Sequence, residues 1–86
     1  MITVELKSTR KRGEYMTDLK EFEIVLLKRS KTKMDIAEML GISLQTLYNK
    51  LNNVVDFKVG EVEKICKFLG LSHDEMIKIF FAISVE

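Results

Sequence analysis

The 86 residues are enough for one small domain and too few for a second hydrophobic core. Hydrophobic residues make up 47% of the chain and charged residues 31%, which excludes a disordered coil. The formal net charge of +1 excludes a chain that holds polyanions by bulk charge alone, and the single cysteine excludes an internal disulfide.

The first 15 residues differ from the rest. Apolar residues alternate with polar ones from residue 2 to residue 6, as in a β-strand, and a basic stretch follows at residues 7–12. An isolated strand is not stable, so this N-terminal arm or extension is disordered, pairs with another segment or acts on DNA. Met16 could equally be the true start, and we take residues 16–86 as the domain.

Five helices separated by short turns are predicted from residue 19 onward. Apolar residues three and four positions apart give one buried face to a first helix that begins near Leu19. A second helix begins at a capping box formed by Thr32 and Asp35: the threonine hydroxyl can accept from a free backbone N–H, and Asp35 suits the positive end of the helix dipole. It ends at Gly41, which suits the left-handed position after a helix.

Ser43 caps a third helix over residues 44–52, and the pair Asn52-Asn53 ends it, because asparagine tolerates a positive φ. A fourth helix has its apolar face over residues 59–69 and ends at the glycine that follows. A second capping box, at residues 72–75, starts the fifth helix. We therefore expect an all-α domain of five helices.

The end of the fifth helix carries more apolar residues than a small core can cover, on more than one face. We expect it to form a homodimer interface. The interface residues predicted are Ile77, Phe80, Phe81 and Val85. Either Phe80 faces inward with Ile83, leaving Phe81 and Val85 outward, or the reverse holds. The alternative to a dimer is a small sheet, within or between chains, in which residues 83–85 pair with residues 2–4.

Residues 32–53 carry the pattern of a helix-turn-helix. Two short helices joined by a turn of about four residues cross steeply, which needs a small residue at the crossing and a glycine in the turn. Ala37 and Gly41 fill these positions. The apolar plugs around them are Ile36, Leu40, Ile42 and Leu47.

The second of these helices projects polar side chains outward. They are Gln45, Thr46, Asn49 and Lys50, with Tyr48 beside them. Amide side chains can bond an adenine edge, and threonine can reach a base or a thymine methyl. Thr32, Lys33 and Ser43 lie at helix N-termini, where N–H groups favour phosphate. Tyr48 either stacks or bonds a phosphate, or is plain surface.

The motif Thr32-Lys33-x-x-Ile36-Ala37-x-x-Leu40-Gly41-Ile42-Ser43-x-x-Thr46-Leu47 resembles the Xre family of lambda-type phage repressors and Cro proteins. The resemblance extends over roughly residues 19–82. It implies a lambda-repressor-like domain whose third helix enters the major groove of double-stranded DNA. On this resemblance Leu44, Gln45 and Asn49 face bases, and Lys33 contacts a phosphate. Asn53 and Lys58 border the loop that holds the DNA backbone, and we expect both to contact phosphates.

Two residues depart from the family pattern. Leu44 stands where many relatives carry glutamine or arginine, so it offers only a thymine-methyl contact. Lys50 replaces an apolar plug, and we expect Leu51 to take that role and Lys50 to join the phosphate contacts.

Charge is unevenly distributed along the chain. Residues 28–58 hold six basic residues against three acidic ones, whereas residues 16–27 hold one against three and residues 59–86 hold three against five. We expect a sequence-specific transcriptional regulator, a phage or prophage repressor or Cro-like protein, that binds a near-palindromic operator as a dimer. The alternative is a protein-interaction module, such as an antitoxin or antirepressor-like protein with weak DNA binding. The arm at residues 10–12 either adds contacts to DNA or is inert.

Catalysis is not expected, because one histidine, one cysteine and scattered carboxylates supply no nucleophile with a base and no metal cluster. We predict no cofactor, no metal and no small-molecule ligand. Cys66 is expected to be a small buried thiol rather than a redox switch. No apolar run approaches the roughly 18 residues of a membrane span, and the start lacks a signal-peptide core, so we expect a cytoplasmic protein.

Overall fold

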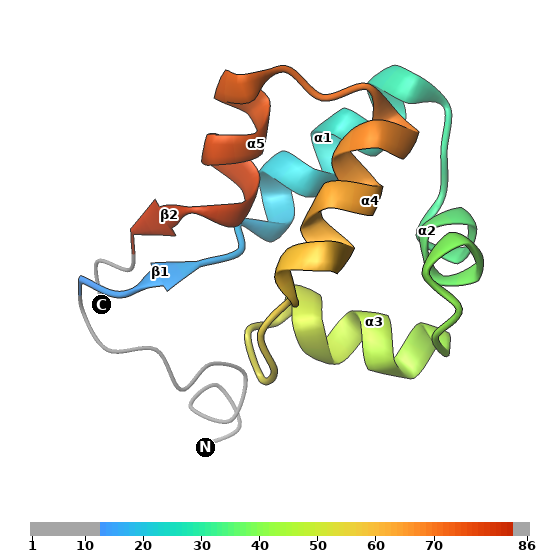
Figure 1. The fold of residues 1–86 in the computed structure, drawn as a ribbon, viewed down its shortest axis with the longest axis horizontal. Helices are drawn as coiled ribbons and strands as arrows, with labels where there is room; N and C mark the ends of the chain where they lie inside the picture. The colour runs from blue at the N-terminus through green and yellow to red at the C-terminus, as the bar shows by residue number, and fades with distance from the viewer. Residues whose placement is uncertain (1–12, 84–86) are drawn as a thin grey trace.

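A computed structural model describes residues 13–83, where it shows the five predicted helices and one pair of short strands (Figure 1). The helices are α1 (Leu19–Arg29), α2 (Lys33–Leu40), α3 (Leu44–Leu51), α4 (Val59–Leu69) and α5 (His73–Phe80). The strands are β1 (Tyr15–Met16) and β2 (Ala82–Ile83). The prediction of an all-α domain of five helices is confirmed, with this small sheet added to it.

The starts of α2 and α5 lie where the local sequence signals predict them. At the start of α2, the Thr32 hydroxyl accepts from the Asp35 N–H at 3.1 Å, and the Asp35 carboxylate accepts from the Thr32 N–H at 2.8 Å. Ser72 and Glu75 make the same two bonds at the start of α5. The bond from the Thr32 backbone also holds the pKa of Asp35 below its ordinary value. The two capping boxes are therefore confirmed.

One core joins all five helices. Among the described residues, the largest fully buried side chains come from every helix: Phe22, Ile36, Leu47, Leu51, Ile65 and Ile79. Cys66 packs half-buried against this core, and burial raises the pKa of its thiol. Val59, expected on the apolar face of the fourth helix, is instead almost fully exposed in the first turn of α4.

The strands β1 and β2 join the two ends of the described chain. They pair antiparallel, with Tyr15 opposite Ile83 and Met16 opposite Ala82. A sheet at the end of the chain was one of the two alternatives, but Ile83 pairs here with Tyr15, a residue expected in the arm. The proposed partner strand at residues 2–4 and the arm at residues 10–12 lie outside the described residues, as does Val85.

The direction of the two phenylalanines at the end of α5 is now clear. Phe80 is 7% exposed and packs edge to face on Phe57, with ring centroids 5.3 Å apart. Phe81 is 40% exposed and meets the ring of Tyr15. Phe80 therefore lies in the core, and its prediction as an interface residue was wrong, because its ring packs on Phe57 inside the fold. No helix of residues 13–83 is long and apolar enough to span a membrane.

Candidate nucleic-acid interface

The helix-turn-helix spacing places α2 and α3 against one another as the sequence predicts. Ile36 and Ala37 are buried at the contact, and the small alanine side chain lets the two helices approach closely. Gly41 takes a φ of 73°, a left-handed value that favours glycine. The N–H of Ile42 then bonds to the Ala37 carbonyl at 3.0 Å and fixes the turn. The outer face of α3 is thereby held at the edge of the fold (Figure 1).

Polar side chains line the outer face of α3. Gln45 and Thr46 are exposed and Asn49 is half-buried. The Gln45 amide group donates to the Asn49 side-chain oxygen at 3.1 Å, so two amides one turn apart lie together. This pairing leaves the Gln45 oxygen as an acceptor and the Asn49 amide group as a donor, the two functions that bind an adenine edge. Leu44 is half-buried against the core, which leaves only part of its side chain for a methyl contact.

The hydroxyl groups at the N-termini of α2 and α3 are engaged in capping. The Ser43 hydroxyl accepts from the Thr46 N–H at 3.0 Å and donates to the Thr46 hydroxyl at 2.9 Å. The Thr32 hydroxyl oxygen accepts from Asp35, and its own O–H is left to donate to an anion. Thr32, Ser43 and Thr46 are all exposed, so the two helix starts are open to a phosphate.

Lys33 is held by residues of the two neighbouring helices. Its Nζ lies 2.6 Å from the Glu23 carboxylate of α1 and 5.6 Å from the ring centroid of Tyr48 on α3. Lys33 is half-buried and Tyr48 is exposed. Glu23 was not predicted, because ten residues separate it from Lys33 and no local spacing links them. The positive charge predicted at this corner is thus partly compensated within the molecule.

Lys50 is buried, and its predicted contact with phosphate was wrong. It is 5% exposed, and its Nζ donates to the Glu61 carboxylate at 3.1 Å and to the Asp56 carbonyl at 3.2 Å. The ring of Phe57 lies 5.9 Å from the same Nζ. Lys50 thus occupies the core position at which the helix-turn-helix pattern has an apolar residue, and its charge is neutralised inside the molecule. Leu51 is buried beside it.

Burial alone would raise the pKa of Glu61, but the hydrogen bonds from the Lys58 backbone and from Lys50 outweigh it and lower the pKa. The Lys58 backbone N–H donates to the Glu61 carboxylate, with 2.9 Å between the nitrogen and Oε1. Glu61 therefore caps α4 and neutralises Lys50 at the same time. Lys58 itself stays exposed at the end of the loop over residues 52–58, where its side chain remains open to a phosphate.

Asn53 is also buried, and its predicted contact with the DNA backbone was wrong. Of the two asparagines expected to end α3, it is the one with a positive φ, 63°, and it is 5% exposed. Its side chain bonds to both backbone groups of Thr17. Beside it, the exposed Val54 and Val55 donate their N–H groups to the Asn49 carbonyl at 2.9 and 3.3 Å. These two valines lie in the loop that follows α3, and no pattern in the sequence predicted that they would be exposed there.

Two further basic residues of the middle segment have partners inside the molecule. Arg29 donates to Glu75 at 2.8 Å and to the Leu69 carbonyl at 3.0 Å. Lys31 lies over the ring of Phe68, 5.1 Å from its centroid. Several of the basic residues between residues 28 and 58 are therefore compensated inside the molecule, and the surface around α3 carries less unpaired positive charge than the sequence count suggests. No group of three metal-ligating side chains occurs within residues 13–83.

The family model of the Cro/C1-type HTH DNA-binding domain matches residues 21–81 of the chain. The matched residues begin in α1 and run past the end of α5, so they cover well over half of the chain and all five helices. No curated protein and no solved structure gives a match.

Proposed function

The chain belongs to the family of Cro/C1-type HTH DNA-binding domains, and on this premise we propose that it is a sequence-specific transcriptional regulator that reads DNA with α3. The family is a DNA-binding fold and not an enzyme fold. We propose further that the protein acts in the cytoplasm as a phage or prophage repressor or Cro-like regulator.

The observation that carries this proposal is the pair of amides on α3. The Gln45 Nε2 and Asn49 Oδ1 atoms lie 3.1 Å apart on the outer face, and we propose that both side chains read bases. Leu44 and Thr46 complete the set of base contacts that we propose. The phosphate contacts that we propose are Thr32, Lys33, Ser43, Tyr48 and Lys58, all of which reach the surface.

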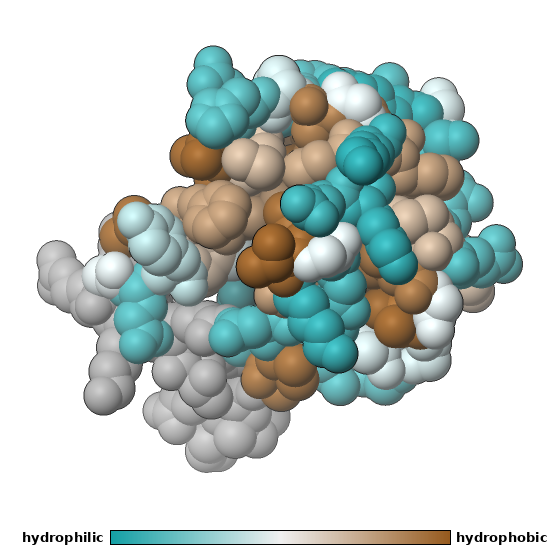
Figure 2. Space-filling view, in the orientation of Figure 1, coloured by the Kyte–Doolittle hydropathy of each residue, from teal (hydrophilic) through white to brown (hydrophobic). Residues whose placement is uncertain are grey.

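A homodimer would place two such helices about one DNA turn, roughly 34 Å, apart and require a near-palindromic site. We propose that it forms through α5 and β2. Ile77, Phe81 and Ile83 are 40 to 50% exposed on this side of the molecule, where Figure 2 shows hydrophobic side chains over α5 and the start of α4. Sedimentation at high micromolar concentration tests the dimer. Ile77→Lys should yield a monomer of about half the wild-type mass, and a wild-type monomer of 10.0 kDa contradicts the proposal.

A second candidate is a protein-interaction module that binds DNA weakly. One observation favours it: three basic residues of the middle segment form ion pairs within the fold. The pairs are Arg29 with Glu75, Lys33 with Glu23, and Lys50 with Glu61. These pairs reduce the unbalanced positive charge that a DNA-binding protein uses to attract phosphates.

Duplex binding across a salt series distinguishes the two candidates. Duplexes that the protein selects from a random pool provide the probe, and a regulator should bind them with log affinity falling linearly with log salt. Gln45→Ala should relax the preference for the selected sequence, whereas Lys33→Ala should weaken binding to all sequences equally. Lys64→Ala, an exposed lysine on α4, is the matched control and should change neither. A failure to select any sequence, with binding insensitive to salt, contradicts the regulator.

A further inference from the structure

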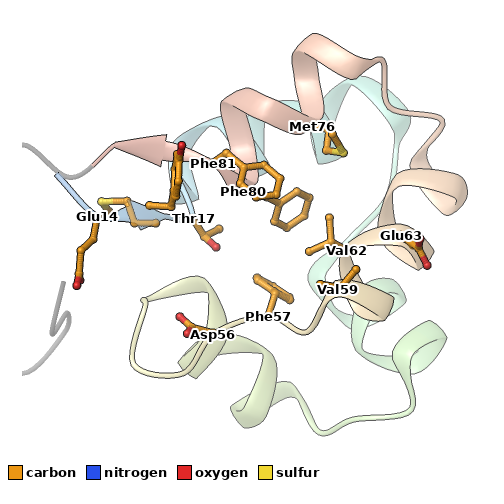
Figure 3. Close-up of a pocket in the computed structure, with 12 residues that line it drawn as sticks. Glu14, Thr17, Asp56, Phe57, Val59, Val62, Glu63, Met76, Phe80 and Phe81 are labelled. Carbon is orange, nitrogen blue, oxygen red and sulfur yellow. The ribbon is translucent and has the colours of Figure 1, made fainter. Parts of the chain in front are cut away.

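The loop over residues 52–58 is held in place by contacts on its inner side. The Asn53 side chain bonds to both backbone groups of Thr17, and the Phe57 ring packs edge to face on Phe80. Figure 3 shows the Phe57 ring pointing from the loop toward Phe80. The loop is therefore fixed without DNA, and a surface that is ordered in advance loses little entropy when a partner binds.

Two adjacent valines of this loop face solvent. Val54 and Val55 are 46% and 49% exposed. Their backbone N–H groups both donate to the Asn49 carbonyl, at 2.9 and 3.3 Å. Asn49 lies in the last turn of α3 and is one of the two amides proposed to read bases. The valine pair is thus attached to the base-reading helix by two hydrogen bonds.

The loop lies at the same edge of the molecule as the outer face of α3. Figure 1 shows the segment between α3 and α4 reaching down as far as α3 itself. Figure 2 shows hydrophobic side chains at this lower edge, beside hydrophilic ones over α3. A DNA duplex that meets the outer face of α3 would therefore also meet this loop.

The loop carries no net charge that would attract phosphates. Its only charged residues, Asp56 and Lys58, have opposite signs. Between the phosphates, the DNA backbone offers the carbon–hydrogen surface of deoxyribose, against which a valine side chain can bury apolar area. Such a contact releases no counterion, so its contribution to affinity does not change with salt. It also carries no direct information on sequence.

We propose that Val54 and Val55 pack on deoxyribose of the DNA backbone beside the bases that α3 reads. Through the Asn49 carbonyl, this contact sets the position of the C-terminal end of α3 against that backbone. The inference rests on the proposed function, because it takes α3 as the recognition helix. It assigns the DNA contact of the loop to apolar side chains, in place of the buried Asn53.

Binding of the full chain to the selected duplex tests the valine pair. The double variant Val54→Ala with Val55→Ala removes four exposed methyl groups and should bind about three- to tenfold more weakly. Its salt slope and its ranking of duplex sequences should stay those of the wild type. Ile24→Ala with Leu27→Ala removes two exposed side chains from α1, which Figure 1 shows away from α3. This matched control should leave the affinity unchanged.

A second double variant separates the DNA contact from a loss of structure. Val54→Thr with Val55→Thr keeps the β-branched shape and replaces one methyl by a hydroxyl at each position. Its affinity should lie between those of the wild type and the alanine variant. Urea unfolding and a dispersed amide spectrum verify that each variant is folded. Wild-type affinity in both folded double variants overturns the inference.

Two further results also overturn it. A lower salt slope in the alanine variant would mean that the loop acts through phosphates. A loss that disappears when deoxyuridine replaces thymidine in the duplex would mean that the valines contact thymine methyls and not sugars. If the wild type selects no duplex, the proposed function fails and the inference with it. If it selects one and the valine variants bind as well, only the inference fails.

Discussion

The side chain of Asn53 bonds to both backbone polar groups of Thr17, 36 residues away in the chain. Its Oδ1 accepts from the Thr17 N–H at 2.8 Å, and its Nδ2 donates to the Thr17 carbonyl at 3.0 Å. Both residues are buried, so no water can replace either bond. Asn53 also holds a left-handed φ, and the one residue therefore ends the turn after α3 and fixes the segment between β1 and α1.

Asn53→Ala should destabilise the fold by about 2–4 kcal/mol. The substitution leaves the Thr17 N–H and carbonyl unsatisfied. It also puts alanine at a positive φ, without the side-chain hydrogen bonds that offset this strain for asparagine. Urea unfolding measures the change. Asn52→Ala, one residue earlier and exposed, is the control and should cost less than about 1 kcal/mol. Equal losses in the two variants would show that the bonds to Thr17 contribute little.

Residues whose structure depends on near neighbours were predictable from the sequence. Thr32 and Asp35 are three positions apart, so their capping box follows from local spacing alone. A positive φ at the pair Asn52-Asn53 followed in the same way, from the tolerance of asparagine for that conformation, and Asn53 is the one that adopts it. The hydrogen bonds between Asn53 and Thr17 could not be predicted, because they depend on how β1 lies against the rest of the fold. Local signals therefore predict where the helices begin and end, and they do not predict which residues far apart in the chain contact one another.

Lys50 shows the same limit at the candidate site. Lys50 was expected to contact phosphate although it stands at an apolar plug position, because the carboxylate that neutralises it there, Glu61, lies on the next helix. Ser30 is another case: it ends α1 with a φ of 57°, where the sequence carries no glycine or asparagine. Gln45 and Asn49 lie on the outer face of α3 as expected, the first exposed and the second half-buried, because helical periodicity alone determines that face.

Lys50→Met should destabilise the fold by about 1–3 kcal/mol, since it keeps the buried stem and leaves the Glu61 carboxylate without its cation. The double variant Lys50→Met with Glu61→Gln should recover part of the loss, because an amide oxygen can still accept from the Lys58 N–H. Urea unfolding of the single and double variants measures this coupling.

The same lysine provides a test of the corrected site. If Lys50 is a structural residue, Lys50→Met should leave the salt slope of duplex binding unchanged under conditions where the variant is folded. Lys58→Met, at an exposed lysine, should lower that slope by about one counterion with little change in stability. A reduced slope for Lys50→Met would mean that Lys50 reaches a phosphate after all.

Stability should fall in acid through Glu75. The hydrogen bonds from the Arg29 guanidinium, at 2.8 and 3.3 Å, and from the Ser72 backbone lower the pKa of Glu75 to about 2. In the unfolded chain the pKa of this carboxyl is near 4.5. Since the folded value is the lower one, the stabilisation is complete above about pH 4.5 and disappears as the pH falls towards about 2.

Thermal unfolding across this pH range measures the effect. Glu75→Gln should have a lower melting temperature than the wild type at neutral pH and a smaller decrease in acid. Asp74→Asn, at the exposed neighbouring position, should retain the wild-type acid decrease. A Glu75→Gln variant whose melting temperature falls as steeply as that of the wild type would assign the acid loss to other carboxylates, such as Asp35 and Glu61, whose pKa values are also lowered.

Glu23→Gln should strengthen DNA binding. Glu23 lies 2.6 Å from the Lys33 ammonium at the start of α2, so it competes with a phosphate for that charge. Its removal should raise duplex affinity several-fold at low salt and steepen the salt slope by up to about one counterion. Asp74→Asn on α5, away from α3 in Figure 1, makes the same change in net charge and is the control.

An equal gain in the Asp74→Asn control would mean that the effect comes from total charge and not from Lys33. A third variant separates the two cases. Adding Lys33→Met to Glu23→Gln should remove the whole gain, because no ammonium is left at that corner for the phosphate to meet. If the double variant keeps the higher affinity, the ion pair with Glu23 does not control the charge presented to DNA.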